Sequence, residues 1–445
     1  MSRAWVVVDL GFGDAGKGTI TDFLVRETRA RLVVRFNGGA QAGHNVVTED
    51  GRSHTFAQFG AGTFVPDTWT YLAEDVVVHP SALLVEARHL EERSFVQQPL
   101  SRLAIAGNAR IITPFHQAAN RVRELARGDA QHGTCGVGVG ETVRDSLEHR
   151  DDVILARDLR GRTRLFRQLE RVRERLWASL RDEIAVLGDD HAELAVFSDS
   201  DLIVRWMEFV RPTCACVVDA DWLTCWFRDK PSDVVFEGAQ GVLLDETYGF
   251  HPHTTWSDCT FRGADSILRH HGFSGDALHI GVMRTYMTRH GAGPFPTEDS
   301  ELCEKLPEIH NASAGWQGNF RRGHADLVLA RYAVRACGGL DALAITHLDR
   351  ITALDRWAIA YQSRAEPALF NHDEQGRIAN LQSGDLEHQE RLGQTLRQVR
   401  PVWAAAPGGE NEWIEQLATA LRVPVWITSA GMTAAHKTWR ASRPL

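Results

Sequence analysis

The strongest constraint on the fold lies near the start of the chain, where an apolar run leads through several glycines into a helical pattern. Residues 5–19 have the sequence WVVVDLGFGDAGKGT. A strand followed by a glycine-rich turn and a helix N-terminus presents backbone N–H groups and the positive end of the helix dipole to an anion. The spacing from Gly11 to Lys17 fits the pattern G-x-x-x-x-G-K. We therefore predict a phosphate-binding loop between a buried strand and a helix that begins near Thr19.

Two residues distinguish this segment from an ordinary phosphate-binding loop. Gly18 stands where Ser or Thr would supply a hydroxyl to magnesium. Asp14 places a carboxylate among groups that would face phosphate oxygens. Because a negative charge repels phosphate, we expect Asp14 either to hold a metal ion or to move a proton.

Apolar runs of strand length recur along the chain, and helical patterns lie between several of them. The runs cover residues 6–10, 32–36, 75–79, 103–105, 234–237, 278–282, 342–347 and 423–428. This alternation predicts an α/β fold with a mainly parallel central sheet, a phosphate-binding loop and helical insertions. No proline- or serine-rich linker divides the sequence, so we expect one domain over residues 1–445 with a helical insertion at about residues 150–230.

Residues 159–182 combine many arginines with leucines at helical spacing. A nucleic-acid-binding helix and an amphipathic helix with a solvated charged face both fit this pattern. Glu170, Glu174 and Asp182 interrupt the positive charge, which favours the amphipathic helix.

Composition narrows the class of protein. A chain of 445 residues that is 43% hydrophobic is long enough for a large core. Its net charge of -9 argues against nucleic acid and membrane surfaces as partners, and no apolar run approaches the length of a membrane span. The seven cysteines show no C-x-x-C pattern and the first residues form no secretory signal, so we expect a cytoplasmic protein.

A second glycine-rich cluster, RFNGGAQAGHN at residues 35–45, directly follows the second predicted strand. Strand ends of an open α/β sheet border the ligand crevice, so this cluster and the first loop are expected to share one pocket. There, His44 can donate a proton to phosphate oxygens and the Gly43 carbonyl can bind magnesium. The alternative is a glycine-rich turn with a surface histidine.

Two further clusters suggest nucleotide contacts. HGTCGVGVG at residues 132–140 offers N–H groups to a second anion or forms a flexible connector. FEGAQG at residues 236–241 follows another strand, and the Gln240 amide suits a purine edge. Nearby, Thr255 offers a hydroxyl, whereas His251 and His253 lack the partner pair that a zinc site needs.

Two more clusters complete the set. RTYMTRHGAGPFPTE at residues 284–298 is polar and cationic, and suits a substrate wall. Asp349 follows the strand predicted at residues 342–347, where a carboxylate can accept the N1 and N2 hydrogens of guanine. A helix N-cap is the alternative role for Asp349.

In this order, the motifs GDAGKG, GAQAGH, FEGAQG and TRHGAGPFPTE resemble those of adenylosuccinate synthetase. The likeness runs from Val6 to about Gly431. That family couples GTP hydrolysis to the joining of aspartate to carbon 6 of inosine monophosphate. The resemblance therefore implies a purine-biosynthetic ligase that uses Mg²⁺ and GTP, works on small molecules and forms a homodimer.

The resemblance also implies roles for single residues. Asp14 matches the base that removes the N1 proton and binds magnesium, and His44 matches the acid at the β–γ bridge. Lys17 would hold phosphates, and the Gly43 carbonyl would bind magnesium. The implied GTP contacts are Gly13, Gly16, Lys17, Gly18, His347, Asp349, Ser429 and Gly431. The implied contacts to the nucleotide substrate are Gln41, Thr134, Cys135, Gln240 and Thr255.

The amine-donor loop departs most from the family. The family pattern V-x-T-T-G-R-x-R is replaced by NASAGWQGNFRRG at residues 311–323. Either Ser313, Arg321 and Arg322 bind the donor carboxylates, or the donor is not aspartate, as in a paralogue with another amine or a modified purine or deoxynucleotide.

Two other departures concern the triphosphate and the dimer. His347 replaces a family lysine, which leaves ATP open as the phosphate donor. The arginine that crosses the family dimer has three candidate counterparts, Arg144, His149 and Arg150. A GTPase switch without ligation is the rival class, against which Asp14 and His44 argue, because a switch needs no purine base catalyst.

Overall fold

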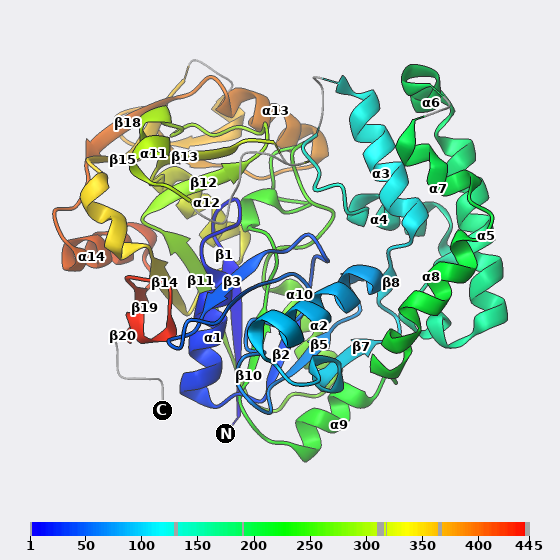
Figure 1. Cartoon of the computed structure of the whole chain (residues 1–445). Helices are drawn as coiled ribbons and strands as arrows, with labels where there is room; N and C mark the ends of the chain where they lie inside the picture. Colours follow the sequence, from blue (N-terminus) through cyan, green and yellow to red (C-terminus); the bar gives the residue numbers. More distant parts are fainter. Residues whose placement is uncertain are drawn as a thin grey trace.

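The centre of the protein is a ten-stranded sheet with the order β20-β19-β14-β11-β1-β10-β2-β5-β7-β9 (Figure 1). The computed structural model describes residues 2–128, 132–188, 191–308, 316, 318–363 and 367–440. Neighbouring strands are parallel except for β19 and β20. The strands are β1 Arg3–Asp9, β2 Leu32–Arg35, β5 Trp69–Leu72, β7 Leu103–Ala106, β9 Val217–Val218, β10 Val234–Glu237, β11 Asp276–Arg284, β14 Ala342–Thr346, β19 Val425–Ser429 and β20 Lys437–Trp439. The predicted α/β class with a mainly parallel sheet is confirmed.

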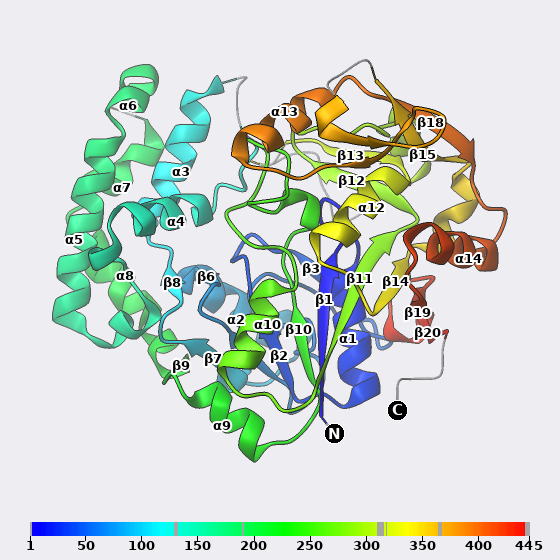
Figure 2. The same cartoon turned by 180° about the vertical axis from the view of Figure 1, so that it is seen from behind.

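Both faces of the sheet are buried, as the continuous apolar run of β1 requires. Trp5 and Val7 pack in one cluster with side chains of α1 (Lys17–Thr28). Ala4, Val6 and Val8 point to the opposite face. There they join a cluster that includes side chains of α10 (Arg262–His270) and α12 (Leu327–Ala336), seen from behind in Figure 2.

Helices extend the molecule beyond the β9 edge of the sheet (Figures 1 and 2). They are α3 Pro114–Ala126, α4 Val139–Glu148, α5 Arg162–Ser179, α6 Arg181–Leu187, α7 Ala195–Ser198 and α8 Leu202–Val210. All of them except α4 contribute to a separate apolar cluster. The other α-helices are α2 Pro80–Ser94, α9 Trp222–Asp229, α11 Ser300–Lys305, α13 Leu386–Leu396 and α14 Glu410–Leu421. Among the described residues, none of the helices combines the length and apolar character that crossing a bilayer requires.

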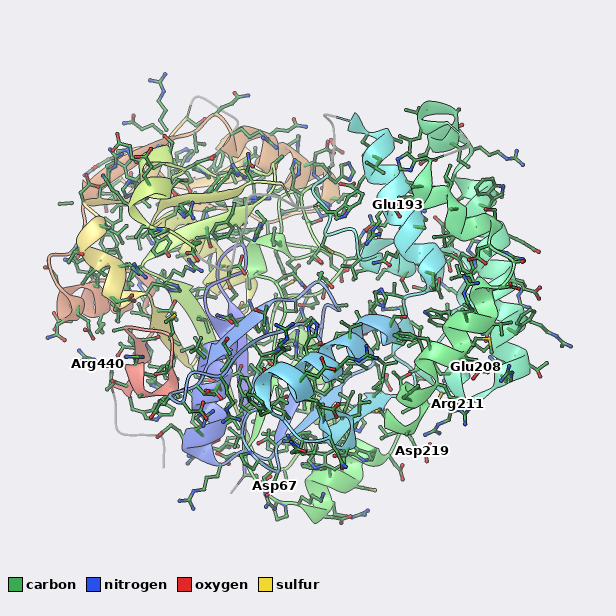
Figure 3. All side chains as sticks on the ribbon, in the orientation of Figure 1. Asp67, Glu193, Glu208, Arg211, Asp219 and Arg440 are labelled. Carbon is green, nitrogen blue, oxygen red and sulfur yellow. The ribbon has the colours of Figure 1, made fainter. Side chains whose placement is uncertain are left out.

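The helix predicted over residues 159–182 is amphipathic, but its bounds differ. A short 3₁₀ turn at Ala156–Arg160 ends at Gly161, and α5 and α6 are separate helices on either side of Leu180. Leucines of α5 are buried, whereas Arg162 and Arg164 face outward and Arg175 turns inward to pair with Asp145. Figure 3 shows outward charge at the end of α8, where Glu208 lies 3.9 Å from Arg211, the residue that follows the helix.

Four smaller sheets complete the described structure. Their strands are β3 His44–Val47, β4 Ser53–Phe56, β6 Val77–Val78, β8 Arg110–Ile111, β12 Tyr286–His290, β13 Phe320–His324, β15 Arg356–Gln362, β16 Phe370–His372, β17 Ile378–Leu381 and β18 Arg400–Ala405. The run at residues 75–79 was predicted as a sheet strand, but only β6 forms there, paired with β8 outside the central sheet. β5 takes that place in the central sheet. Its Thr70 makes the apolar run of this strand less evident in the sequence, and the Thr70 hydroxyl accepts a hydrogen bond from the Gly60 N–H at 3.0 Å.

Candidate active site

A cavity of about 410 Å³ opens at the carboxyl ends of the central strands. The loop after β1, the segment that leads into β3, and the ends of β10, β14 and β19 supply its walls. It contains all of the predicted GTP contacts and both predicted magnesium ligands, as well as Gln41 and Gln240. One cavity therefore brings together residues that lie more than 400 positions apart in the sequence.

A buried ion pair fixes the first loop. Asp9, at the end of β1, accepts hydrogen bonds from the N–H groups of Gly11 at 2.7 Å and Ala15 at 2.8 Å. The Lys17 ammonium lies 3.1 Å from Asp9 Oδ2 and donates to the Gln240 carbonyl at 2.6 Å. Asp9 was not among the residues predicted from the sequence, although its place at the strand end was a usable signal. This arrangement holds Lys17 at the floor of the cavity.

The structure explains why Gly18 replaces the usual hydroxyl residue. A Cβ added at Gly18 would lie 2.7 Å from the His44 Cβ and 3.2 Å from its backbone. Strand β3 therefore packs directly on the start of α1, and this contact brings His44 beside the loop.

We expect Gly18→Ser, which restores the ordinary loop residue, to displace His44 and to lower kcat at least about tenfold while costing about 1–3 kcal/mol from overpacking. Steady-state kinetics and urea unfolding measure the two effects. Gly409→Ser is the control, because a Cβ there meets nothing within 4 Å. Normal kinetics in Gly18→Ser would contradict the packing argument.

Asp14 is held with its carboxylate toward the cavity. Its backbone has a positive φ of 60°, and its carbonyl accepts a hydrogen bond from Arg284 Nε at 2.6 Å. Its Oδ2 lies 3.3 Å from His290 Nε2. Burial alone would raise the pKa of Asp14, but the contact with His290 and the charges of Arg284 and Lys17 hold it below the usual value. Asp14 is therefore ionised at neutral pH and able to accept a proton.

His44 forms a buried pair with Glu237. His44 Nδ1 lies 2.6 Å from Glu237 Oε1, and Glu237 Oε2 accepts the Ala61 N–H at 3.0 Å. Arg35 Nε lies 4.0 Å from the same carboxylate. Burial raises the pKa of Glu237, but His44 and then Arg35 lower it by more, so it lies below its usual value. Burial lowers the pKa of His44 more than Glu237 raises it. The imidazole is therefore neutral without ligand and donates Nδ1–H to Glu237, and its Nε2 atom has no hydrogen bond to any residue that the structure describes.

Glu237 was not predicted as a site residue. It belongs to the FEGAQG motif, in which Gln240 was predicted as a site residue because its amide matches the hydrogen-bonding edge of a purine. Nothing in the sequence links Glu237 to His44, 193 positions away. The parallel pairing of β10 with β2 sets Glu237 opposite Arg35, and the packing of β3 on the start of α1 brings His44 to the same carboxylate.

Gln41 and Gln240 face the cavity with unused hydrogen-bonding capacity. The Oε1 atom of each is buried without a partner in the described structure. Both amides lie against the Gly38–Gly39 turn, where Cβ atoms would come within 2.8 and 3.0 Å of them. Two buried amide oxygens without partners suit a polar heterocycle, since an unpaired buried group costs free energy.

The far end of the cavity contains His347, Asp349, Ser429 and Gly431. The His347 carbonyl accepts a hydrogen bond from Thr285 at 2.9 Å, and Asp349 pairs with Arg350 at 3.0 Å. Lys437, which the sequence did not indicate, donates to the carbonyls of Gly431 at 2.9 Å and Thr433 at 2.8 Å. Burial lowers the pKa of Lys437 to about 8.

The remaining predicted contacts do not line the cavity: Thr134, Cys135, Thr255, Arg321 and Arg322. The Thr134 N–H donates to Glu124 at 3.2 Å, and burial raises the pKa of Cys135. Arg321 pairs with Glu298 at 2.8 Å, and Arg322 lies over the Phe320 ring. Ser313 lies outside the described residues.

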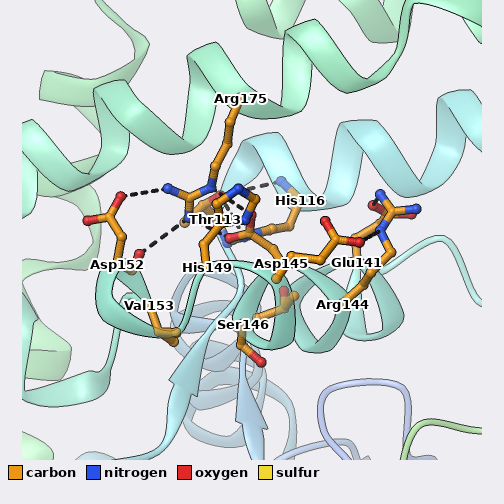
Figure 4. A network of polar contacts seen from close by, with 12 residues as sticks. Thr113, His116, Glu141, Arg144, Asp145, Ser146, His149, Asp152, Val153 and Arg175 are labelled. Carbon is orange, nitrogen blue, oxygen red and sulfur yellow. Dashed lines mark hydrogen bonds and ion pairs between the residues drawn. The ribbon is translucent and has the colours of Figure 1, made fainter.

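A polar network braces the helices that carry the glycine-rich segment 132–140 (Figure 4). Arg175 of α5 donates to Asp145 of α4 at 2.6 Å and to Asp152 at 2.6 Å, and His116 of α3 lies 3.2 Å from Asp145. Of the three candidates for a cross-dimer contact, Arg144 pairs with Glu141 at 2.5 Å and His149 lies 3.4 Å from Asp145. Both are thus engaged within their own chain.

The donor set fits magnesium bound together with phosphates. Asp14, whose carboxylate is ionised, and Gly43 line the same cavity. Among the described ranges, no cluster of three or more His, Cys, Asp or Glu side chains forms a self-contained metal site. Magnesium prefers oxygen ligands and is usually held by one or two carboxylates plus substrate phosphates, so this partial set suits it.

Comparisons with known proteins agree with this site. The family model for adenylosuccinate synthetase matches residues 6–438. Adenylosuccinate synthetase of Anaeromyxobacter dehalogenans is 33% identical over 415 residues, covering 93% of this chain and 88% of the relative. The Prochlorococcus marinus (strain NATL1A) enzyme is 30% identical over 444 residues, covering 96% and 94%.

Two solved structures share the fold. The fully ligated adenylosuccinate synthetase of Plasmodium falciparum has a TM-score of 0.77 and 21% identity, covering 98% of this chain and 99% of that one. The succinoaminodeoxyadenylate synthetase of cyanophage S-2L, bound to dGMP and dATP, has a TM-score of 0.59 and 17% identity, covering 99% and 96%. The family match over residues 6–438 and the two relatives at 33% and 30% identity show that the chain belongs to the adenylosuccinate synthetase family, the carbon–nitrogen ligases of purine biosynthesis that hydrolyse GTP.

Proposed function

We propose that the protein transfers the γ-phosphoryl group of GTP to oxygen 6 of an inosine monophosphate-like nucleotide. The amine of aspartate or a related amino acid then displaces phosphate and gives an adenylosuccinate-type product. The observation that carries the proposal is the meeting of ionised Asp14, Lys17 and the His44–Glu237 pair in one cavity. Asp14 can take up a proton, and Lys17 beside it can bind phosphate. This pair suits a nucleotide substrate that must lose a proton before its oxygen attacks phosphorus.

In this mechanism Asp14 removes the N1 proton, which places negative charge on oxygen 6 and makes it the nucleophile. Lys17 binds the phosphates from the floor of the cavity. Phosphate charge favours the imidazolium form of His44, so Nδ1–H donates to Glu237 and Nε2–H donates to the oxygen between the β- and γ-phosphorus atoms. Asp14 and the Gly43 carbonyl would hold Mg²⁺, which would supply further charge neutralisation. Catalysis is then positioning and electrostatic stabilisation.

The other predicted contacts divide by substrate. Asp349, with His347, Ser429 and Gly431, reads the guanine of GTP, and Gly13, Gly16 and Gly18 let the loop approach its phosphates. Gln41 and Gln240 bind the nucleotide substrate within the cavity, and Thr134, Cys135 and Thr255, outside it, are further contacts to the same nucleotide. Ser313, Arg321 and Arg322 bind the amine donor. The chain acts as one unit and pairs with a second copy as a cytoplasmic homodimer.

A second candidate is ligation of an amine other than aspartate. The pairing of Arg321 with Glu298, and its donation to the Gly293 carbonyl at 2.7 Å, favour this candidate. A guanidinium that already binds a carboxylate and a carbonyl has fewer N–H groups left for a substrate carboxylate.

Mass spectrometry of products from a panel of 6-oxopurine nucleotides, triphosphates and amino acids tests both candidates. We expect phosphate release from GTP to require a nucleotide acceptor, and the product mass to equal the acceptor plus the amine less water. Incorporation of another amine, with none of aspartate, would select the second candidate. Phosphate release from GTP at the same rate with and without a nucleotide acceptor would instead support a GTPase switch and overturn the proposal.

A further inference from the structure

His290 lines the cavity at the end of β12 but has no task in the mechanism above. Its Nε2 atom lies 3.3 Å from Asp14 Oδ2. Its Nδ1 atom is buried and has no hydrogen-bond partner within the described ranges. Because an Asp14 carboxylate oxygen faces Nε2, the imidazole proton belongs on Nε2, and this N–H group donates to the Asp14 carboxylate.

The ring of His290 is itself held in place. It packs against Phe320 with centroids 4.6 Å apart and planes inclined by 55°. Phe320 begins β13, and the antiparallel register sets it directly opposite His290. Phe320 also belongs to the segment 311–323, whose sequence departs from the family in the amine-donor loop. His290 thus joins the donor side of the site to Asp14.

The two cations near Asp14, Arg284 and Lys17, are committed elsewhere. Arg284 donates to the main-chain carbonyl of Asp14 and pairs with Glu308. Lys17 is bound to Asp9 and to the Gln240 carbonyl. Of these three groups, His290 makes the direct contact with an Asp14 carboxylate oxygen.

We propose that His290 is a positioning residue for Asp14. Its Nε2–H holds Oδ2, which limits rotation of the carboxylate and leaves Oδ1 directed at the N1 proton of the purine. This inference rests on the proposed function, in which Asp14 removes that proton. A displacement of about 1 Å in a reacting group can cost about 10²-fold in rate, so one restraining contact has a large effect.

The test compares His290→Leu, which keeps an apolar side chain beside Phe320 and loses the donor, with His290→Gln, which keeps an N–H donor. The full chain is incubated with Mg²⁺, inosine monophosphate and GTP labelled with ¹⁸O in the β-nonbridging positions, without any amine. Reversible transfer to oxygen 6 moves the label into the β–γ bridge, so the exchange rate reports deprotonation and transfer and does not depend on the amine donor.

We expect His290→Leu to slow the exchange about 10²-fold with the KM for GTP changed less than about twofold, and His290→Gln to restore most of the rate. Thermal unfolding confirms that both variants are folded. Wild-type exchange in His290→Leu overturns the inference. Equal losses in the two variants also overturn it, because the effect would then come from ring packing and not from the donor.

Asp14→Asn separates this inference from the proposed function. If Asp14→Asn exchanges label at the wild-type rate, Asp14 is not the base and the proposed function fails. If Asp14→Asn is inactive while His290→Leu is normal, the proposed function stands and only the role of His290 fails.

Discussion

Asp14→Asn will lower kcat by about 10²–10⁴-fold, the range that a positioned general base contributes. The amide is nearly the same size as the carboxylate but cannot accept the N1 proton, so oxygen 6 stays a poor nucleophile. Steady-state phosphate release and product formation measure the loss. GTP binding, measured by calorimetry, will remain detectable because Lys17 and the loop N–H groups are unchanged.

The same change at Asp349 is the matched control. Asp349 lies at the far end of the cavity and is proposed to read the base of GTP, so Asp349→Asn will raise the KM for GTP more than it lowers kcat. Product formation by Asp14→Asn at near the wild-type rate would remove Asp14 from the role of base. Equal effects of the two substitutions on kcat would have the same consequence.

Glu237→Gln is expected to have the second-largest effect, on both activity and stability. Glu237 is fully buried, and its charge faces His44 and Arg35. Removing one partner of a buried ionic group costs about 3–5 kcal/mol, because the remaining charge stays uncompensated. The neutral amide also stops stabilising the imidazolium form of His44, so kcat will fall at least about tenfold. Urea unfolding and kinetics measure the two losses.

Glu86→Gln provides the comparison that isolates the catalytic part. Glu86 is also buried and accepts the N–H groups of Ala57 and Gln58, each at 2.9 Å, but it does not line the cavity. The Glu86→Gln variant will be less stable than the wild type, but its folded form will keep the wild-type kcat. If Glu237→Gln behaves in the same way, the His44–Glu237 pair serves the fold alone.

The sequence predicted those features that one short segment specifies. The strand, glycines and lysine of residues 5–19 predicted the first loop, and the long apolar runs predicted the parallel sheet. Strand β5 escaped prediction because Thr70 interrupts its apolar run, and its burial depends on a partner at Gly60. Residue propensities do not predict a hydrogen bond between two residues that only the folded chain brings together.

Within the site, the residues missed were those that act through another residue. Asp9, Glu237 and Lys437 hold Lys17, His44 and the Gly431 carbonyl, respectively. Each carries a charge whose usual place is the surface, and only the assembled sheet brings its partner near. Residues that would touch a ligand stand in recognisable glycine-rich motifs, whereas their supports do not.

The contact of Lys17 with the Gln240 carbonyl, 223 positions later in the chain, bears on how the protein folds. The Leu243 N–H likewise donates to the Gly11 carbonyl at 3.0 Å. The first loop is therefore completed by a segment synthesised long after it, and contacts of such sequence separation form slowly. An emerging N-terminal half lacks these contacts, so the nucleotide can stabilise the protein only after more than half of the chain has been made.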